Sequence, residues 1–287
     1  MTSIVLDDAR SASSLSGLSA GASASQTMRA VLRYAIRDML RNRWMLAYGV
    51  GIAGIVEVLF RTTGSGSRAL IGILNLVLII IPLVSVVFGV MYWHSTREFN
   101  ELLLAQPVKR RALWSGLYLG LIVPLAIAYV AGITAPLLLH RAIDAQSLPI
   151  LVAMLLAGVA LTAIFGGLAM LIGTCVDDRL KGIGLSFAVW IAMTALYDGV
   201  VLLVSTSFSD YSLERTMLAF TIANPVDLAR TTIVLRTDTS ALMGYTGAVI
   251  EKFLGTGVGS LAAVAGLGLW IVVPAWLALR AFERRDF

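Results

Sequence analysis

A few residues of this 287-residue chain have side chains that bind metal ions, but their spacing does not form a known motif. Met91 and His94 are three residues apart, so a helix would place them on one face. Sulfur and imidazole ligands of this kind suit Cu(I). Cys175 is the single cysteine of the chain. Because methionine usually fills gaps in packing, we predict no metal site, with Met91 and His94 as the least poor candidate ligands.

Motifs that would support catalysis are incomplete. Gly184 to Ser186 resembles the surroundings of an intramembrane serine nucleophile, but no histidine lies inside an apolar run to act as its base. The glycines within 49–54 match G-x-G-x-x-G, yet the run is apolar and no strand precedes it, which favours helix packing. No G-x-x-x-x-G-K-[ST] loop is present. We therefore predict a non-catalytic chain with no catalytic residue, no cofactor and no ATP site of its own.

Long apolar runs are the elements that must position these residues. Hydrophobic residues make up 58% of the chain and charged residues only 14%, whereas soluble domains carry roughly 25% charged residues. A membrane-spanning helix needs roughly 20 apolar residues. The runs that are long enough are 44–60, 69–92, 112–139, 149–175, 183–204 and 254–280. The sequence predicts an all-α, polytopic integral membrane protein with six transmembrane helices in one domain, residues 44–287.

Lysine and arginine are distributed unevenly between the loops. The N-terminal segment, the loops after the second and fourth runs, and the C-terminal tail carry 15 of the 22 basic residues. Basic loops are retained in the cytoplasm. Both termini are therefore predicted to be cytoplasmic, and the segment 205–253 to be periplasmic in a Gram-negative bacterium. This placement also accounts for the net charge of +5 without nucleic acid as a partner.

The residues before the first run form two units. Residues 1–27 are rich in Ser, Ala and Gly, which predicts a disordered cytoplasmic tail. Residues 28–43 place an arginine at every fourth position from Arg29 to Arg41, beside an apolar stripe. This pattern fits an amphipathic helix on an anionic membrane surface, and it equally fits a plain cytoplasmic helix end.

The loop between the second and third runs has a helical pattern of its own. One side, mostly apolar, has Phe99, Leu102, Leu103 and Gln106 at helical spacing, and the charged side has Arg97, Glu98 and Glu101. Pro107 ends the predicted helix. A short amphipathic helix of this kind docks into a groove on a soluble partner or rests on lipid, and the periodicity does not distinguish the two.

The outer segment 205–253 is too long for a simple turn, because loops beyond about 15 residues usually have a function or structure of their own. The stretch SLERTMLAF predicts a helix, and Asn224-Pro225 predicts the start of another. Asp227 would then lie near the positive end of that helix. The segment is interpreted either as a platform for an extracytoplasmic partner or as a lid on its own spans.

Glu57 and Asp198 lie within predicted spans. Ionisable residues are unfavourable in hydrocarbon, so both are functional candidates. Both are also within a few residues of the outer boundary. Extension of the side chain to the membrane surface, or contact with the outer segment, therefore explains them as well.

With these residues in view, the chain resembles ABC-2 type transporter permeases, and more closely the NosY-type permeases of the nitrous-oxide-reductase maturation system. The resemblance runs from about Tyr34 to Phe287. The strings that carry it are MYWHSTREFNELLLAQPVKRR (91–111), ANPVDLAR (223–230), SALMGYTGAV (240–249) and LWIVVPAWLALRAFERRDF (269–287).

The resemblance implies an assembly in the bacterial inner membrane. It comprises two permease copies, two cytoplasmic ATPases that use ATP and Mg²⁺, and a periplasmic subunit with a β-helical fold. Such an assembly supports copper-site formation in nitrous oxide reductase, a periplasmic enzyme. That enzyme and a copper chaperone are further candidate partners, besides membrane lipid.

The resemblance also implies roles for particular residues. The stretch from Arg97 to Gln106 would couple to the ATPase. The periplasmic partner would contact Asn224, Pro225, Asp227 and Arg230. The alternative is an ABC-2 type exporter of another cargo, such as a sulfur species, a lipid or a drug. Trp190 and Tyr197, seven residues apart, could line its route or simply pack.

Overall fold

The computed structural model describes residues 43–63, 66–97, 110–140, 147–208, 214–234 and 257–284. Regular structure in these ranges is helical throughout, as the sequence predicted. The predicted N-terminal tail, most of the amphipathic stretch 28–43 and the coupling residues Glu98 to Gln106 lie outside the described residues.

Six helical spans in the described ranges are long and apolar enough to cross a membrane, which confirms the predicted fold class. They are α3 (Arg43–Thr63), α4 (Gly66–Ser95), α6 (Arg110–Leu139), α7 (Leu148–Cys175), a fifth span of three parts, and α13 (Gly257–Arg284). The fifth span, called span five below, comprises α8 (Arg179–Ile191), η1 (Ala192–Leu196) and α9 (Tyr197–Ser207). Two shorter helices follow it, α10 (Glu214–Ala223) and α11 (Pro225–Val234).

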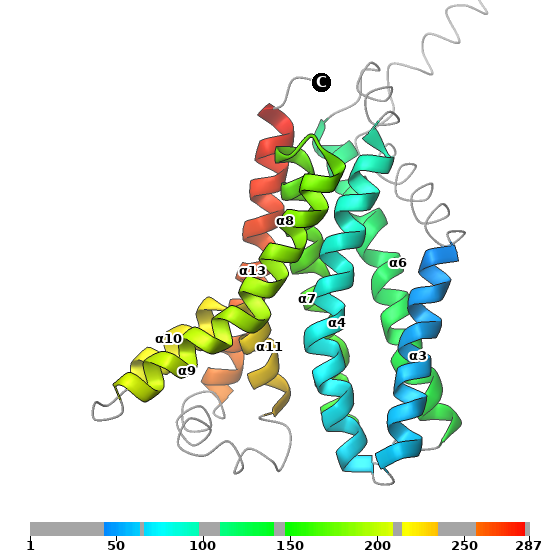
Figure 1. Ribbon diagram of the computed structural model, residues 1–287, viewed down its shortest axis with the longest axis vertical. Coiled ribbons are helices and arrows are strands. Elements are labelled where there is room, and N and C mark those ends of the chain that lie inside the picture. The colour runs from blue at the N-terminus through cyan, green and yellow to red at the C-terminus, as the bar shows by residue number, and fades with distance from the viewer. Residues whose placement is uncertain are drawn as a thin grey trace, which may run out of the picture.

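The long helices run between two ends of the bundle (Figure 1). The basic end carries Arg97, Arg110, Arg111, Arg179, Lys181, Arg280 and Arg284. There the start of α6 contacts the end of α13, because Arg111 Nε pairs with Glu283 Oε1 at 2.6 Å. At the opposite end α3 contacts the end of α6, where His140 Nε2 lies 2.7 Å from Glu57 Oε2. The helices therefore alternate in direction, as short connections require.

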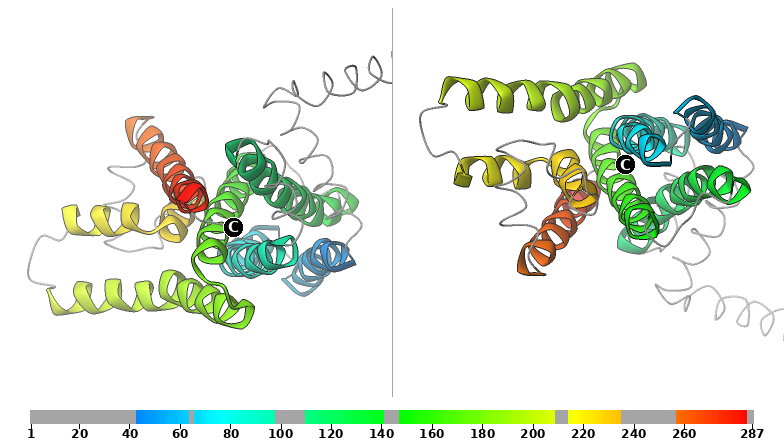
Figure 2. Two further views of the ribbon diagram at one scale, coloured as in Figure 1. Left: turned by 90° about the horizontal axis from the view of Figure 1, so that it is seen from above. Right: turned by 90° about the horizontal axis from the view of Figure 1, so that it is seen from below.

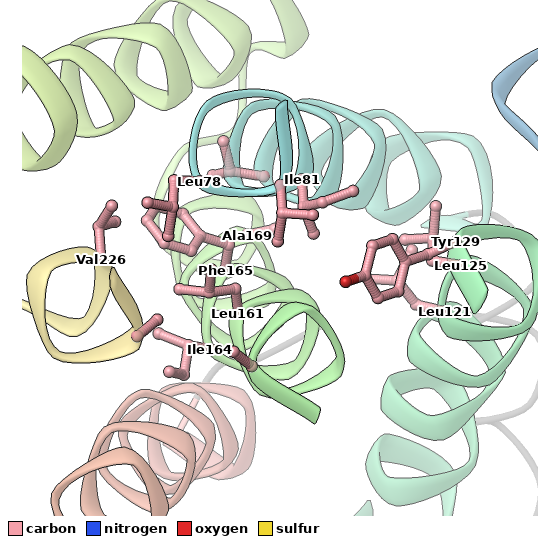
Figure 3. Close-up of a cluster of buried hydrophobic side chains, with 14 of the residues drawn as sticks. Leu78, Ile81, Leu121, Leu125, Tyr129, Leu161, Ile164, Phe165, Ala169 and Val226 are labelled. Carbon is pink, nitrogen blue, oxygen red and sulfur yellow. The ribbon is translucent and has the colours of Figure 1, made fainter. Parts of the chain in front are cut away.

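Helix α7 lies at the centre of the core, where it packs against α4, α6, α11 and α13. Figure 3 shows Leu161, Ile164 and Phe165 of α7 with labelled side chains of α4, α6 and α11 around them. Small residues permit this close packing, since Gly158 leaves room for the ring of Tyr129 from α6. The Tyr129 hydroxyl donates to the carbonyl of Met154 at 2.7 Å.

Span five lies at the periphery. Of its residues, all of which the structure describes, only Gly182 and Ser186 are buried. A π-helical turn, η1, interrupts it, and the amide of Tyr197 donates to the carbonyl of Ala192. Beyond this turn α9 and α10 both extend away from α3 and α6 (Figure 2). The sequence predicted one uninterrupted span here and did not indicate the π turn.

Candidate functional site

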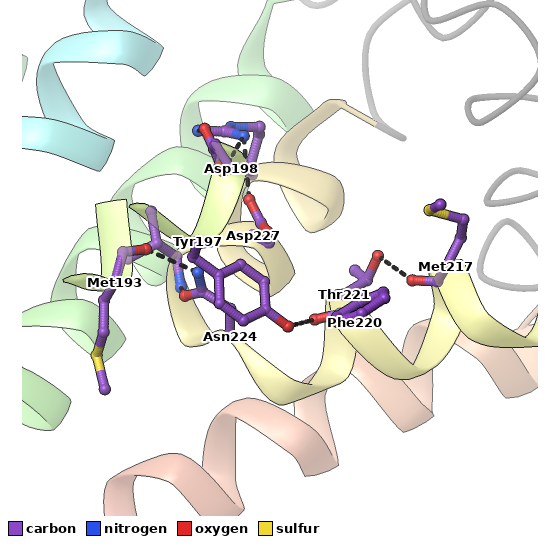
Figure 4. A network of polar contacts seen from close by, with 10 residues as sticks. Met193, Tyr197, Asp198, Met217, Phe220, Thr221, Asn224 and Asp227 are labelled. Carbon is purple, nitrogen blue, oxygen red and sulfur yellow. Dashed lines mark hydrogen bonds and ion pairs between the residues drawn. The ribbon is translucent and has the colours of Figure 1, made fainter. Parts of the chain in front are cut away.

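Polar side chains from α9 and α11 meet backbone atoms of η1 and α10 near the opposite end of the bundle (Figure 4). This outer polar network consists of Met193, Tyr197, Asp198, Phe220, Asn224, Asp227 and Arg230. It contains Asp198 and three of the four outer residues that the resemblance assigns to a periplasmic partner. The fourth, Pro225, is the first residue of α11.

Asn224 makes two different contacts at the break between α10 and α11. Its Oδ1 accepts a hydrogen bond from the amide of Val226 at 2.9 Å, which caps α11. Its Nδ2 donates to the carbonyl of Met193 in the π turn at 2.7 Å. Asn224 is 1% exposed, so both bonds are shielded from water. The helix start predicted at Asn224-Pro225 is confirmed, whereas the bond to Met193 was not predicted.

Two aromatic side chains bind the last turn of α10. The Tyr197 hydroxyl donates to the carbonyl of Phe220 at 2.7 Å, and Trp270 Nε1 donates to the carbonyl of Ile222 at 3.1 Å. The last four carbonyls of a helix have no intrahelical partner. In a membrane such groups need other donors, because lipid supplies none. Tyr197 of α9 and Trp270 of α13 thus stabilise a helix end beside the membrane domain.

Arg230 binds two carboxylates from different helices. Its Nη2 lies 3.1 Å from Asp198 Oδ2, and its Nη1 lies 3.0 Å from Asp227 Oδ1. The pKa of Asp227 is raised to about 6, chiefly by burial; the positive charge of Arg230 lowers it in part, and the negative charge of Asp198 adds to the rise. Asp198 therefore contacts the outer segment, which is one of the two explanations that the sequence allowed for it.

A second set of contacts lies at the basic end, where α4 ends. We call it the basic-end latch: His94, Arg97, Val176 and Asp177. His94 Nδ1 lies 2.9 Å from the carbonyl of Val90 on the same helix, and Nε2 lies 3.2 Å from the carbonyl of Val176. Arg97 Nη1 pairs with Asp177 Oδ1 at 3.3 Å. The latch connects the end of α4 to the short link between α7 and α8.

Asp178 fixes the start of α8 directly after this latch. Its Oδ1 accepts hydrogen bonds from the amides of Leu180 at 2.8 Å and Lys181 at 3.0 Å. The amide of Lys181 is the main reason why the pKa of Asp178 lies below its usual value. The link from Val176 to Asp178 is therefore bonded on both sides, to α4 and to α8.

Of the two candidate metal ligands, His94 has both ring nitrogens in contact with the backbone. Both ring nitrogens of His94 face backbone carbonyl oxygens, so neither is directed at an open position beside Met91. Among the described residues, no three His, Cys, Asp or Glu side chains gather closely enough to hold a metal ion. Cys175 is exposed.

Glu57 forms a separate cluster at the opposite end. Its two oxygens bind Arg61 Nε and His140 Nε2, each at 2.7 Å. The His140 ring also stacks on Phe60, with ring centroids 5.4 Å apart. Glu57 therefore joins α3 to the end of α6. Asp198, by contrast, belongs to the outer polar network.

Trp190 lies midway along span five. Its Nε1 donates to the carbonyl of Ile79 in α4 at 3.0 Å. Ile79 precedes Pro82, whose missing amide leaves this part of α4 with a weakened hydrogen-bond ladder. Both aromatic residues considered as route-lining, Trp190 and Tyr197, thus donate hydrogen bonds to neighbouring helices.

Comparison with known proteins identifies a family. The model of a family described as ABC-2 family transporter protein matches residues 13–287, which includes every described helix. No curated protein matches the sequence.

Proposed function

Because the chain belongs to the ABC-2 family of transporter proteins, we propose that this permease subunit serves an ABC complex that supports copper-site assembly in nitrous oxide reductase. Two copies associate with two cytoplasmic ATPases, which bind ATP and Mg²⁺, and with a periplasmic β-helical subunit. The basic end of the bundle faces the cytoplasm of a bacterial inner membrane. Copper is handled by the complex, and this chain has no catalytic role.

The observation that carries the proposal is the attachment of the outer segment to span five. The side-chain amide of Asn224 binds the Met193 carbonyl of span five, and the guanidinium of Arg230 binds the Asp198 carboxylate of the same span. A segment bonded in this way follows the movement of the membrane helix that holds it. The permease then acts on its periplasmic partner by movement, and copper does not need to pass through it.

Similarity of sequence supports the choice of pathway. The strings 91–111, 223–230, 240–249 and 269–287 resemble NosY-type permeases more closely than ABC-2 permeases in general. Two of them meet in the structure: 223–230 contributes Asn224 to the outer polar network, and 269–287 contributes Trp270, which binds the end of α10. The similarity therefore includes residues that attach the outer segment to the membrane helices.

A copper transport assay tests whether the permease transmits movement only. The complete complex is reconstituted in sealed vesicles, and copper inside and outside is measured with ATP and without it. We expect ATP hydrolysis without stoichiometric copper movement. ATP-dependent copper transport would reject the proposal. Stimulation of the ATPase by a sulfur species, lipid or drug, without the periplasmic subunit, would instead favour export of that cargo.

The coupling segment provides a second test. Replacing Phe99 and Leu102 by Asp places charges on the apolar side predicted to dock on the ATPase. We expect the double variant to insert normally but to lose the co-purified ATPase, as measured by pull-down from solubilised membranes. The matched control replaces Glu98 and Glu101 by Gln on the charged side, which should retain the ATPase. Retention by both variants would contradict the docking model.

A further inference from the structure

We propose that span five is the lever that carries movement from the coupling segment to the outer segment, with its pivot at Trp190. This rests on the proposed function, because a lever is meaningful only if ATP hydrolysis moves the coupling segment. The proposal names the path of the movement and the residues that bind it at each end. The observations come from three levels along the same span.

The cytoplasmic end of the lever is bound to the start of the coupling segment. His94 and Arg97 lie in the last turn of α4 and directly after it, and they bind Val176 and Asp177. Asp178 then connects that link to α8 through two amide bonds. Gly182 allows α8 to approach α4 closely, because a Cβ there would lie 3.0 Å from Val90 and 3.3 Å from His94. A displacement of residue 97 is therefore passed to the first turn of α8.

The pivot lies at the hydrogen bond from Trp190, near the end of α8, to α4. Trp190 Nε1 donates to the carbonyl of Ile79, four residues before the middle of the π turn at Thr194. The Thr194 hydroxyl donates to the carbonyl of Trp190 at 2.7 Å, which satisfies a backbone group at the irregular turn. π turns mark positions where a helix is interrupted, often at functional sites. Movement of the inner arm, α8, which packs along α4, is passed through this point to the outer arm, α9.

The outer end of the lever is bound to α10 and α11 by three side chains. They are Tyr197, which binds the Phe220 carbonyl, Asp198, which binds Arg230, and Asn224, which binds the Met193 carbonyl. Two of these side chains belong to α9 and one to the break between α10 and α11. The outer segment is thus bonded to the outer arm and to the turn next to the pivot.

The remaining surface of span five permits movement. No residue of η1 or α9 is buried, and apolar residues such as Leu196, Leu202 and Leu203 are more than 60% exposed. Lipid chains are as apolar as leucine, so wherever this surface faces lipid its movement changes little free energy. Helix α7 lacks this freedom, because Gly158 packs against Tyr129 and Gly173 packs against Trp93. Within span five, η1 and α9 are the part that can move against the bundle, since α8 packs along α4.

Distance measurements between spin labels test the lever in the complete, ATPase-containing complex. The reference label is at Leu139→Cys on α6, and the reporter is at Thr206→Cys on α9 or Ala219→Cys on α10, all three being exposed positions. The background is Cys175→Ser, and labelled copies are diluted with unlabelled ones so that each distance lies within one chain. Distances are compared without nucleotide and after trapping with ATP and vanadate. We expect both reporters to shift.

Two release variants locate the path. The inner-release variant, His94→Ala with Arg97→Ala, should lose the shift at both reporters, and His94→Gln, whose amide can still donate toward Val176, should keep it. The outer-release variant combines Tyr197→Phe, Asp198→Ala and Asn224→Ser, since serine still caps α11 but does not reach Met193. The outer-release variant should keep the distance shift at residue 206 and lose it at residue 219.

The control is Trp270→Phe, which removes only a bond from α13 to α10 and should keep both shifts.

The remaining outcomes separate the lever from the proposed function. Distances without nucleotide should be the same in all variants, which shows that the helices keep their positions. A shift at residue 219 that survives either release variant would overturn the lever, although ATP-driven transmission would stand. Absence of any shift in the parent protein during normal ATP turnover would instead overturn the proposed transmission itself.

Discussion

Helix α7 and span five are similar in the sequence and different in the structure. They span 28 and 29 residues, and both are apolar enough to cross a membrane. More than half of α7 is buried, whereas in span five only Gly182 and Ser186 are. Similar composition thus serves a central helix in one case and a peripheral one in the other.

The two spans are also held by different forces. Around α7 the neighbours approach closely over glycines, so close packing holds the helix in place. In span five, α8 packs along α4, but η1 and α9 make few such contacts, and side-chain hydrogen bonds hold them at separate points: Met193, Tyr197 and Asp198. A helix held at points can turn between them, whereas a helix packed along its length cannot.

The largest expected effect tests this contrast in packing. Gly158→Ala would drive a methyl group into the Tyr129 ring, whereas a Cβ at Gly184 in span five meets nothing within 4 Å. We expect Gly158→Ala to lower the free energy of unfolding by about 2–3 kcal/mol, as overpacking does. Gly184→Ala should cause no loss, since alanine favours helix. Unfolding in mixed micelles measures both, and equal effects would contradict the contrast.

A smaller effect tests how the hydrogen bonds act. Tyr197→Phe removes the donor to the Phe220 carbonyl, and Tyr129→Phe removes the donor to the Met154 carbonyl. We expect each to remove about 1 kcal/mol. The loss in Tyr197→Phe should be local, with amide hydrogen exchange in α10 roughly fivefold faster and little change in global unfolding. Tyr129→Phe should lower global stability and leave exchange in α10 unchanged; the reverse pattern would show that the outer network belongs to the core.

The smallest effect concerns pH. The pKa of Asp227 is raised to about 6, so the folded protein binds this proton more tightly than the unfolded chain does. The resulting stability is fully present below the ordinary value of 3.8 and is lost as pH rises through about 6. Between pH 7.5 and 5.5 we expect a gain of at most about 0.8 kcal/mol.

Comparison with Asp227→Asn isolates this contribution, since the amide does not titrate. As pH falls from 7.5 to 5.5, the unfolding free energy of the wild type should rise relative to that of the variant. A difference that is the same at both pH values would show that Asp227 keeps an ordinary pKa in the folded protein.

Part of the candidate site was predictable from the sequence. Asn224-Pro225 predicted a helix start because both residues have strong positional preferences at helix N-termini, and Asp198 stood out because ionisable residues are rare in apolar runs. The basic-end latch was not predictable. His94 and Val176 are 82 residues apart, and a backbone carbonyl, which every residue has, gives no signal in the sequence.

The sequence by itself determined the six spans, their family and the uneven distribution of basic residues, since these follow from length, composition and local order along the chain. Only the tertiary structure decided that α7 lies in the centre and span five at the edge, and that Trp190, Asn224 and Arg230 hold span five at fixed points. The physical reason is that a span apolar on all sides has no amphipathic pattern to mark its buried face. In lipid, close packing and a few polar bonds between distant residues make that choice.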